Sequence, residues 1–433
     1  MVGRFTGRLK NKRGNISIFV VIVFTCFLTV SAVLFAAAKS VTNRSMTDAS
    51  LQLAGRSVLA EYDRRLLSDY GLLAFRGDEG WVEDAIVYYT EASIAPRNPL
   101  YLAFRGGGER IIAQDARCED VVVSLAGYSL LDLESFESQL REAVITELVG
   151  SLLPSQGRVG GSAEGRTERD DGYGRVLRDK GVISSLPSTG FKGPLFPSFG
   201  DITDIPAYGN VMNAGASLFS VTEYAIAIFG NHVDGSVKDH FFGNEIEYLI
   251  AGYHDDSANY NNIKHRLRAM RYVANNFALA ADSKKMEKVE EIAFLISLIN
   301  GESHFEQIKV AVMQAWVAAE TGNDLMLLER GDKVALLKAP SQWATQNIEE
   351  IWNGWTSSEP SYPSDRNGQS YRDYLRIMLY VLDRETKLLR IMDLMQINLK
   401  GTYYREFLMR EHYTGFRFEC LVDGEHYAYT EIY

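Results

Sequence analysis

The most prominent hydrophobic pattern in the chain is an uninterrupted apolar run that follows a cluster of basic residues. Residues 14–38 contain no charged side chain, and the stretch 16–38 is 23 residues long. A helix of that length spans roughly 34 Å at about 1.5 Å per residue, and the hydrocarbon core of a bilayer is about 30 Å thick. The pattern therefore predicts a transmembrane helix over residues 16–38.

A helical period continues beyond this run. Between residues 39 and 69 apolar side chains recur every three or four positions with no proline, and Gly71 follows as a helix-ending residue. We expect the membrane helix to continue outside the bilayer as a long helical spine. Further helices are expected over residues 81–93, 132–153 and 211–320, and over 371–399 with a break near Asp383.

Strand patterns are few and short. Apolar runs predict strands at 72–75, 121–125 and 331–338, and the pair Asp423-Gly424 lies between two alternating runs, which is typical of a β-hairpin. The alternation places the following side chains on one face of that hairpin: Phe416, Phe418, Cys420, Val422, Tyr427 and Tyr429. The expected fold class is α+β, mostly helical, with a C-terminal β-hairpin.

Composition divides the chain into five parts. Residues 1–15 form a basic leader, 16–38 the transmembrane helix, and 39–153 the spine with the first part of an external domain. Residues 154–200 are rich in glycine and poor in side chains that can be buried, so we expect a loop or linker there. Residues 201–433 form the main α+β external domain.

Charge sets the expected orientation and excludes one class of partner. Five basic residues and no acidic one precede the span: Arg4, Arg8, Lys10, Lys12 and Arg13. Short basic flanks stay in the cytoplasm, so the remainder is expected outside the cell membrane. The chain has a net charge of −11, which leaves −16 for residues 15–433. Such an acidic domain argues against a nucleic-acid partner.

Three fates are open for the N-terminal segment. It can remain as an uncleaved anchor, which the length of the run favours. It can be a secretory signal cut after the small residues at 36–38. It can also be a pilin-type leader cut between Gly14 and Asn15, although Phe19 stands where pilins carry glutamate. Cys118 and Cys420 can pair in an oxidising exterior, but their spacing does not decide the question.

Several stretches resemble one family in the same order along the chain. They are "RGNISIF" (13–19), "SVLAEYDRRLLSDYGLLAF" (57–75), a block at 244–276, "GDKVALLKAPSQW" (331–343) and a block at 374–399. Together they resemble uncharacterised Gram-positive envelope proteins that carry a domain of unknown function. That family is similar to the TadE/TadG-type minor pseudopilins of tight-adherence (Flp) pilus loci. The resemblance implies a bacterial membrane-tethered exterior protein whose partners are other membrane helices or pilus-assembly proteins, and it implies no catalytic residue and no cofactor.

The candidate chemistry is sparse. His232, Asp234, Asp239 and His240 lie close together in sequence and are residue types that bind metal ions, but the stretch is also typical of an ordinary polar turn. The three tryptophans Trp343, Trp352 and Trp355 suggest either a binding platform or, as we favour, core packing. No nucleophile motif and no phosphate-binding loop is present.

These patterns favour a non-enzymatic, single-pass membrane protein without a cofactor, whose external domain makes protein contacts. Two alternatives stay open at this point. One is an envelope metal-dependent hydrolase that uses His232 and His240. The other is a secreted binding module released by signal cleavage.

Overall fold

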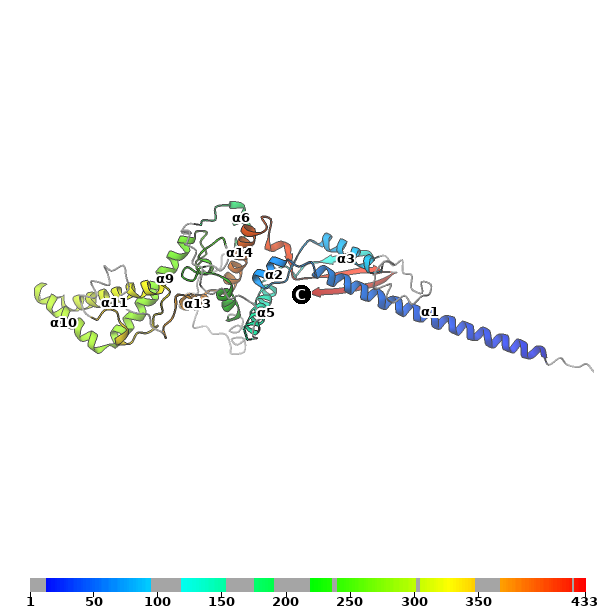
Figure 1. Ribbon diagram of the computed structural model, residues 1–433, viewed down its shortest axis with the longest axis horizontal. Helices are drawn as coiled ribbons and strands as arrows, with labels where there is room; N and C mark the ends of the chain where they lie inside the picture. The colour runs from blue at the N-terminus through cyan, green and yellow to red at the C-terminus, as the bar shows by residue number, and fades with distance from the viewer. Residues whose placement is uncertain are drawn as a thin grey trace, which may run out of the picture. The chain divides into compact units, whose positions relative to one another are not determined.

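The computed structural model describes residues 13–94, 118–152, 175–190, 219–235, 240–300, 304–346, 367–422 and 424–433. The chain forms two compact units, whose elements are labelled in Figure 1. Unit 1 comprises residues 1–62, 74–128 and 413–433, and unit 2 comprises residues 63–73 and 129–412. Unit 1 is thus assembled from both ends of the chain.

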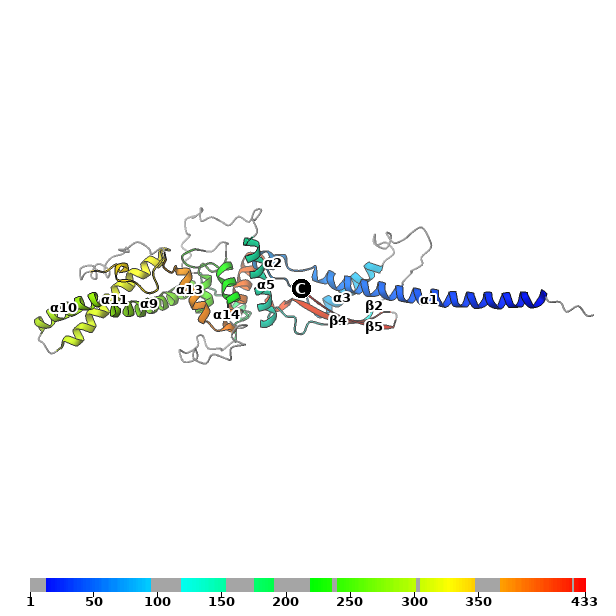
Figure 2. The same cartoon turned by 90° about the horizontal axis from the view of Figure 1, so that it is seen from below.

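Unit 1 combines helices with a three-stranded antiparallel sheet, visible from the side in Figure 2. Its helices are α1 (Arg13–Leu59) and α3 (Glu79–Ile94). The sheet has the order β2-β4-β5 and consists of β2 (Cys118–Ser124), β4 (Gly415–Val422) and β5 (Glu425–Ile432). The short strands β1 (Phe75–Arg76) and β3 (His412–Tyr413) form a separate two-stranded sheet.

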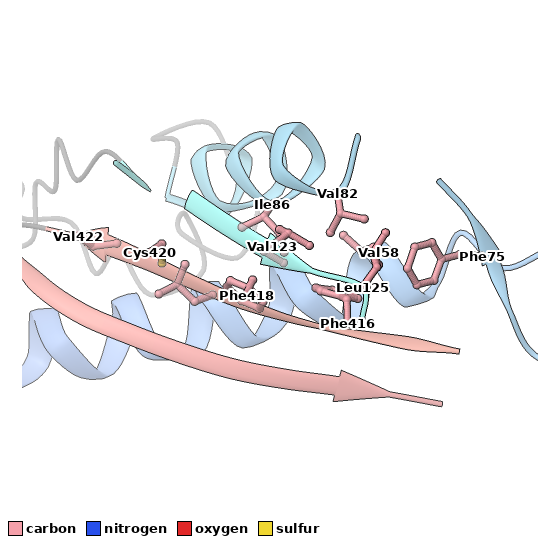
Figure 3. Close-up of a cluster of buried hydrophobic side chains, with 12 residues drawn as sticks. Val58, Phe75, Val82, Ile86, Val123, Leu125, Phe416, Phe418, Cys420 and Val422 are labelled. Atoms are coloured by element: carbon pink, nitrogen blue, oxygen red, sulfur yellow. The ribbon is translucent and has the colours of Figure 1, made fainter. Parts of the chain in front are cut away.

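One face of this sheet carries the core of unit 1, shown in Figure 3. Alternate residues of a strand share a face, so β4 turns every second side chain inward. Helix α1 contributes Leu51, Ala54 and Val58, whose spacing of three and four places them on one stripe. The complete buried cluster is Leu51, Ala54, Val58, Phe75, Val82, Ile86, Val123, Leu125, Phe416, Phe418, Cys420 and Val422.

Unit 2 is helical. Its helices are α2 (Arg64–Tyr70), α5 (Leu133–Leu152), α6 (Lys180–Ser184), a helix at Phe219–Ile228, α8 (Glu245–Ala251), α9 (Asp256–Ala281), α10 (Ser283–Asn300), α11 (Phe305–Glu329), α13 (Tyr371–Val381) and α14 (Arg384–Thr402). Short 3-10 helices lie at Pro340–Gln342 and Met409–Glu411. Helix α14 is buried along most of its length and packs against α8 and α5, whereas α9, α10 and α11 pack on one another.

The mostly helical α+β class and the C-terminal hairpin are confirmed. In the hairpin Phe418 pairs with Tyr429 and Cys420 with Tyr427, as the alternation predicts. The break near Asp383 is also present, because the Asp383 carboxylate accepts a hydrogen bond from the Thr386 backbone N–H and so begins α14. The hairpin groups with α1 in unit 1, although the sequence placed it with residues 201–433.

Three local predictions are wrong. The helix expected over 39–69 stops at Leu59 and restarts at Arg64, because Asp63 caps α2 by accepting hydrogen bonds from the backbone N–H groups of Arg65 and Leu66. The strand expected over 331–338 is a single bridge between Val334 and Gln369. The strand expected over 72–75 shrinks to β1.

The tryptophan question is resolved for one of the three side chains. Trp343 is fully buried and packs in the cluster that joins α9, α10 and α11. It is therefore a core residue and takes no part in an open platform. Trp352 and Trp355 lie outside the described residues.

Candidate functional site

The polar stretch singled out in the sequence folds as a turn. The Asn231 side-chain oxygen accepts hydrogen bonds from the backbone N–H groups of Val233 and Asp234, each over 3.0 Å. Its amide nitrogen donates to the Asp234 carboxylate over 2.8 Å, and the Gly235 N–H closes the turn on the Asn231 carbonyl. Asp234 thus helps to hold the turn, as expected of an ordinary polar turn.

The two candidate histidines bind different partners. His232 Nδ1 lies 3.1 Å from Asn244 Oδ1, and its ring stacks on Tyr260 with 3.9 Å between ring centroids. His240 Nδ1 lies 2.9 Å from Glu245 Oε1, and only 8% of its side chain is exposed. Asp239 lies outside the described residues. In the part of the chain that the structure describes, no three His, Cys, Asp or Glu side chains gather in an arrangement that could hold a metal ion.

Three buried carboxylates, Glu245, Glu247 and Asp256, surround the start of α8, and we call them the α8 carboxylates. Each accepts hydrogen bonds from backbone N–H groups of the neighbouring loops. Glu245 receives the N–H of Gly230, and Glu247 receives that of His232, each over 2.9 Å. Buried backbone donors need such partners, so these side chains fix the path of both loops.

Side chains from distant helices complete this centre. Tyr371 of α13 donates its hydroxyl hydrogen to Glu247 Oε1 over 2.8 Å, and Asn398 of α14 donates to Glu245 Oε1 over 2.7 Å. Burial raises the pKa of Glu247 to about 7 and also raises the pKa of Asp256. These hydrogen bonds position α8 against α13 and α14, and they engage most of the oxygen atoms of the α8 carboxylates.

Sequence reasoning missed the α8 carboxylates because acidic side chains usually lie at the surface. The stretch "NEIEYLIAG" places two glutamates in the first turn of a helix, a pattern that a solvated helix N-terminus also shows. The available signal was weak: the two glutamates stand in the first turn, and the other five residues of this seven-residue helix are apolar.

The second candidate site is the N-terminal part of α1, where apolar side chains are exposed. From Ile18 to Val41 the helix leaves these large side chains uncovered: Ile18, Phe19, Val20, Val21, Ile22, Val23, Phe24, Phe27, Leu28, Val30, Val33, Leu34, Phe35 and Val41. Among the described residues, the stretch Ser17–Leu59 is long and apolar enough to cross a membrane. A signal sequence near an N-terminus has the same character, so the composition fits either an anchor or a signal.

Two threonine hydroxyls of this segment are satisfied within the helix. The Thr25 hydroxyl donates to the Val21 carbonyl oxygen over 2.8 Å, and the Thr29 hydroxyl donates to the Cys26 carbonyl oxygen over 2.8 Å. Internal satisfaction is what a lipid environment demands of a spanning helix. Gly14 and Asn15, the candidate processing position, lie in the first turn of α1.

Unit 2 also exposes apolar side chains on two short stripes. Val273 and Phe277 lie one helical turn apart on α9, and Phe294, Leu295 and Leu298 lie together on α10. Phe277 is 69% exposed. Single exposed apolar residues are ordinary on protein surfaces, but stripes of this kind favour contacts with other molecules.

A model of a family of unknown function (DUF5702) matches residues 192–424, which is more than half of the chain. The match includes the α8 carboxylates and most helices of unit 2, and it begins well after α1. No curated protein and no solved structure matches the chain.

Proposed function

The chain belongs to DUF5702, a family of unknown function, and we propose that it is a membrane-anchored structural or interaction protein rather than an enzyme. The observation that carries this proposal is the two environments of α1. Its N-terminal part exposes apolar side chains, whereas Leu51, Ala54 and Val58 are buried in the core of unit 1.

Exposed apolar surface is unfavourable in water by about 25 cal/mol for each Å². A bilayer removes that cost for an apolar helix whose backbone groups are paired internally. Because α1 continues without a break from the apolar part into the packed part, the bilayer would hold unit 1 through a single rigid helix. The basic residues before the span support an orientation with the N-terminus in the cytoplasm and both units outside the cell.

The finer form of the proposal is a minor pseudopilin-like component of Tad/Flp pilus assembly. The resemblance of residues 13–19 and 57–75 to that group of proteins supports it, as does the packing of α1 on an antiparallel sheet. In this role the exposed part of α1 would pack against other membrane helices. The stripes on α9 and α10 would then contribute contacts with assembly proteins.

Among the residues that the structure describes, no observation favours the metal-dependent hydrolase. His232 and His240 are engaged with Asn244 and Glu245, and the turn that contains Asp234 is held by Asn231. The secreted binding module stays as an outcome of the experiment below.

The test is fractionation of the host with determination of the mature N-terminus by intact mass. We expect the protein in the carbonate-resistant membrane fraction. A start at Asn15 would support pilin-type processing, and an uncleaved start would support a simple anchor. A soluble protein starting at Lys39 would overturn the anchor in favour of a secreted module.

Two matched arginine variants separate membrane insertion from a general loss of folding. Leu28→Arg places a charge in the middle of the span, which costs about 2.5–3.5 kcal/mol on insertion scales. Leu53→Arg places the same charge on an exposed position of the packed part of α1. We expect Leu28→Arg to deplete the membrane fraction and Leu53→Arg to leave it unchanged; equal behaviour would contradict the proposal.

A further inference from the structure

Two cysteines of unit 1 lie next to each other on neighbouring strands. In the β2–β4 register Cys118 pairs with Val422, and Cys420 is two residues before Val422 on β4. Since alternate residues of a strand share a face, Cys118, Val422 and Cys420 point to the same side of the sheet. Figure 3 shows Cys420 and Val422 together on the core side of β4.

Burial and contact agree with this placement. Cys420 is fully buried in the core cluster, and Cys118 is half-buried and packs against the same cluster. Both thiols are free in the structure, and each shifts the pKa of the other, that of Cys118 downward and that of Cys420 upward. A β-bulge between Glu119 and Val122 adjoins Cys118, and bulges let a strand bend locally. Diagonal neighbours on a regular sheet stand farther apart than the Cβ separation of about 3.5–4.5 Å that a disulfide needs, so formation of the bond would use the bend at this bulge.

We propose that Cys118 and Cys420 form a redox pair that an external disulfide donor oxidises to a disulfide joining β2 and β4. The oxidised state in the cell rests on the proposed function, because disulfides persist in oxidising compartments outside the cytoplasm. The capacity of the pair to form the bond depends only on the geometry of unit 1.

The chemistry is thiol–disulfide exchange with a donor protein or small molecule that carries a disulfide. Cys118 is the more exposed of the two thiols, and the interaction with Cys420 lowers the pKa of Cys118, so Cys118 is the first nucleophile. Its thiolate attacks one donor sulfur, the donor disulfide breaks, and a mixed disulfide forms. Cys420 then loses its proton and attacks Cys118 Sγ, which expels the second donor thiolate. The pair loses two electrons and two protons, and the donor disulfide gains them as two thiols.

This bond would have a structural consequence for the whole chain. The larger segment of unit 2, residues 129–412, lies between β2 and β4 in the sequence, so the bond would close a loop from residue 118 to residue 420. A long closed loop restricts the unfolded chain strongly, so the disulfide should stabilise unit 1. It would also hold the two ends of the chain together even when a bond within unit 2 is cut.

The experiment uses the full chain purified in detergent and incubated with oxidised glutathione. Free thiols are then alkylated in denaturant and the chain is digested with trypsin. Cleavage after arginine places Cys118 in peptide 118–141 and Cys420 in peptide 418–433. We expect these peptides as one linked species, two hydrogen atoms lighter than their sum, that reductant separates. We also expect a melting midpoint higher by about 5 °C than that of the reduced protein.

Two variants provide the comparison. Cys118→Ser changes a half-buried position and should abolish both the linked species and the rise in melting midpoint. Cys26→Ser removes the third cysteine, which lies in the apolar part of α1, and should leave both unchanged. The proposal would be overturned if the wild type gave two separately alkylated peptides, or if it carried glutathione on Cys118 alone.

The same digest of protein taken directly from alkylated host cells separates the two proposals. A linked species in the host supports the redox pair and the external location together. If the disulfide forms in the purified protein but both cysteines are reduced in the host, the redox pair is supported and the external location is contradicted.

Discussion

Arg271 Nη2 lies 2.9 Å from Asp324 Oδ2, and neither side chain is exposed to solvent. This ion pair joins α9 to α11. Arg271 also donates to the carbonyl oxygens of Ala335 and Leu336, each over 2.9 Å. Lys338 pairs with both Asp324 and Glu320, so two buried cations face two buried carboxylates. Burial of charge is costly, and this group is tolerable because its members compensate one another.

Asp324→Ala should be strongly destabilising. The substitution leaves Arg271 buried with no carboxylate partner, and breaking a buried pair in this way costs about 3–5 kcal/mol. Urea unfolding of the full chain in detergent, followed by the fluorescence of the buried Trp316 and Trp343, would measure the loss. Glu290→Ala, which removes the exposed partner of Lys309, is the control and should change little. Similar losses in both variants would contradict this account.

The buried Glu247 should make unit 2 less stable as the pH rises. Burial raises its pKa from 4.5 to about 7, so the folded state holds a proton that the unfolded state releases. A raised carboxyl pKa gives stability that is complete below the unfolded value and is lost as the pH rises through the folded value. The stability is therefore lost between about pH 4.5 and 7, and the free energy of unfolding falls by roughly 3 kcal/mol over that range.

Glu247→Gln tests this directly. The glutamine keeps an oxygen that can accept from the His232 N–H and the Tyr371 hydroxyl, and it carries no charge. Melting midpoints at pH 5 and pH 8 should differ less in the variant than in the wild type. Asp393, whose pKa burial raises to about 6, stays in both proteins and serves as the common background. An equal pH dependence in the two proteins would show that Glu247 is not protonated when folded.

The sequence was sufficient where a local signal decides the structure. The hairpin follows from alternation on both sides of Asp423-Gly424, and the start of α14 follows from the capping side chain of Asp383. The apolar run of α1 is visible for the same reason, since length and composition alone define it. In each case the residues that determine the element are neighbours in the chain.

The sequence was insufficient where partners are distant. No residue near Cys118 indicates that β2 pairs with β4, which follows about three hundred residues later. The grouping of both chain ends into unit 1 therefore could not be predicted from the sequence. Residues 331–338 have a strand-like composition, but they do not form a strand. Lys338 forms ion pairs with Glu320 and Asp324, and Val334 forms a single bridge. The α8 carboxylates were missed because burial of an acidic side chain depends on helices such as α13 and α14 elsewhere in the sequence.

Gly252 should be intolerant of any side chain. Its φ of +75° lies in the left-handed region, and an added Cβ would collide with the guanidinium group of Arg390. Arg390 donates to the carbonyl oxygens of Leu249 and Ile250, so displacing it would also leave the end of α8 unsatisfied. We expect Gly252→Ala to cost about 2–4 kcal/mol from backbone strain together with the lost hydrogen bonds.

Gly235 is the matched control for that substitution. Its φ is +79°, and nothing lies within 4 Å of an added Cβ. Gly235→Ala should therefore cost only the strain of the left-handed conformation, about 1–2 kcal/mol. Chemical unfolding of the two variants separates backbone strain from the displacement of Arg390. If the two losses are equal, the contact with Arg390 contributes nothing.

At Gly55, α1 packs closely against the side chain of Glu431 on β5. An added Cβ would lie 2.7 Å from Cγ of Glu431, whose side chain packs over the glycine. Gly55→Leu should force α1 and β5 apart and lower the stability of unit 1 by about 1–3 kcal/mol, as overpacking of a close contact does. Glu431→Ala removes the atoms that the new side chain would meet, so the double variant should recover part of the loss. A double-mutant cycle on the melting of unit 1 measures this coupling, and strictly additive losses would show that α1 does not depend on the close contact with β5.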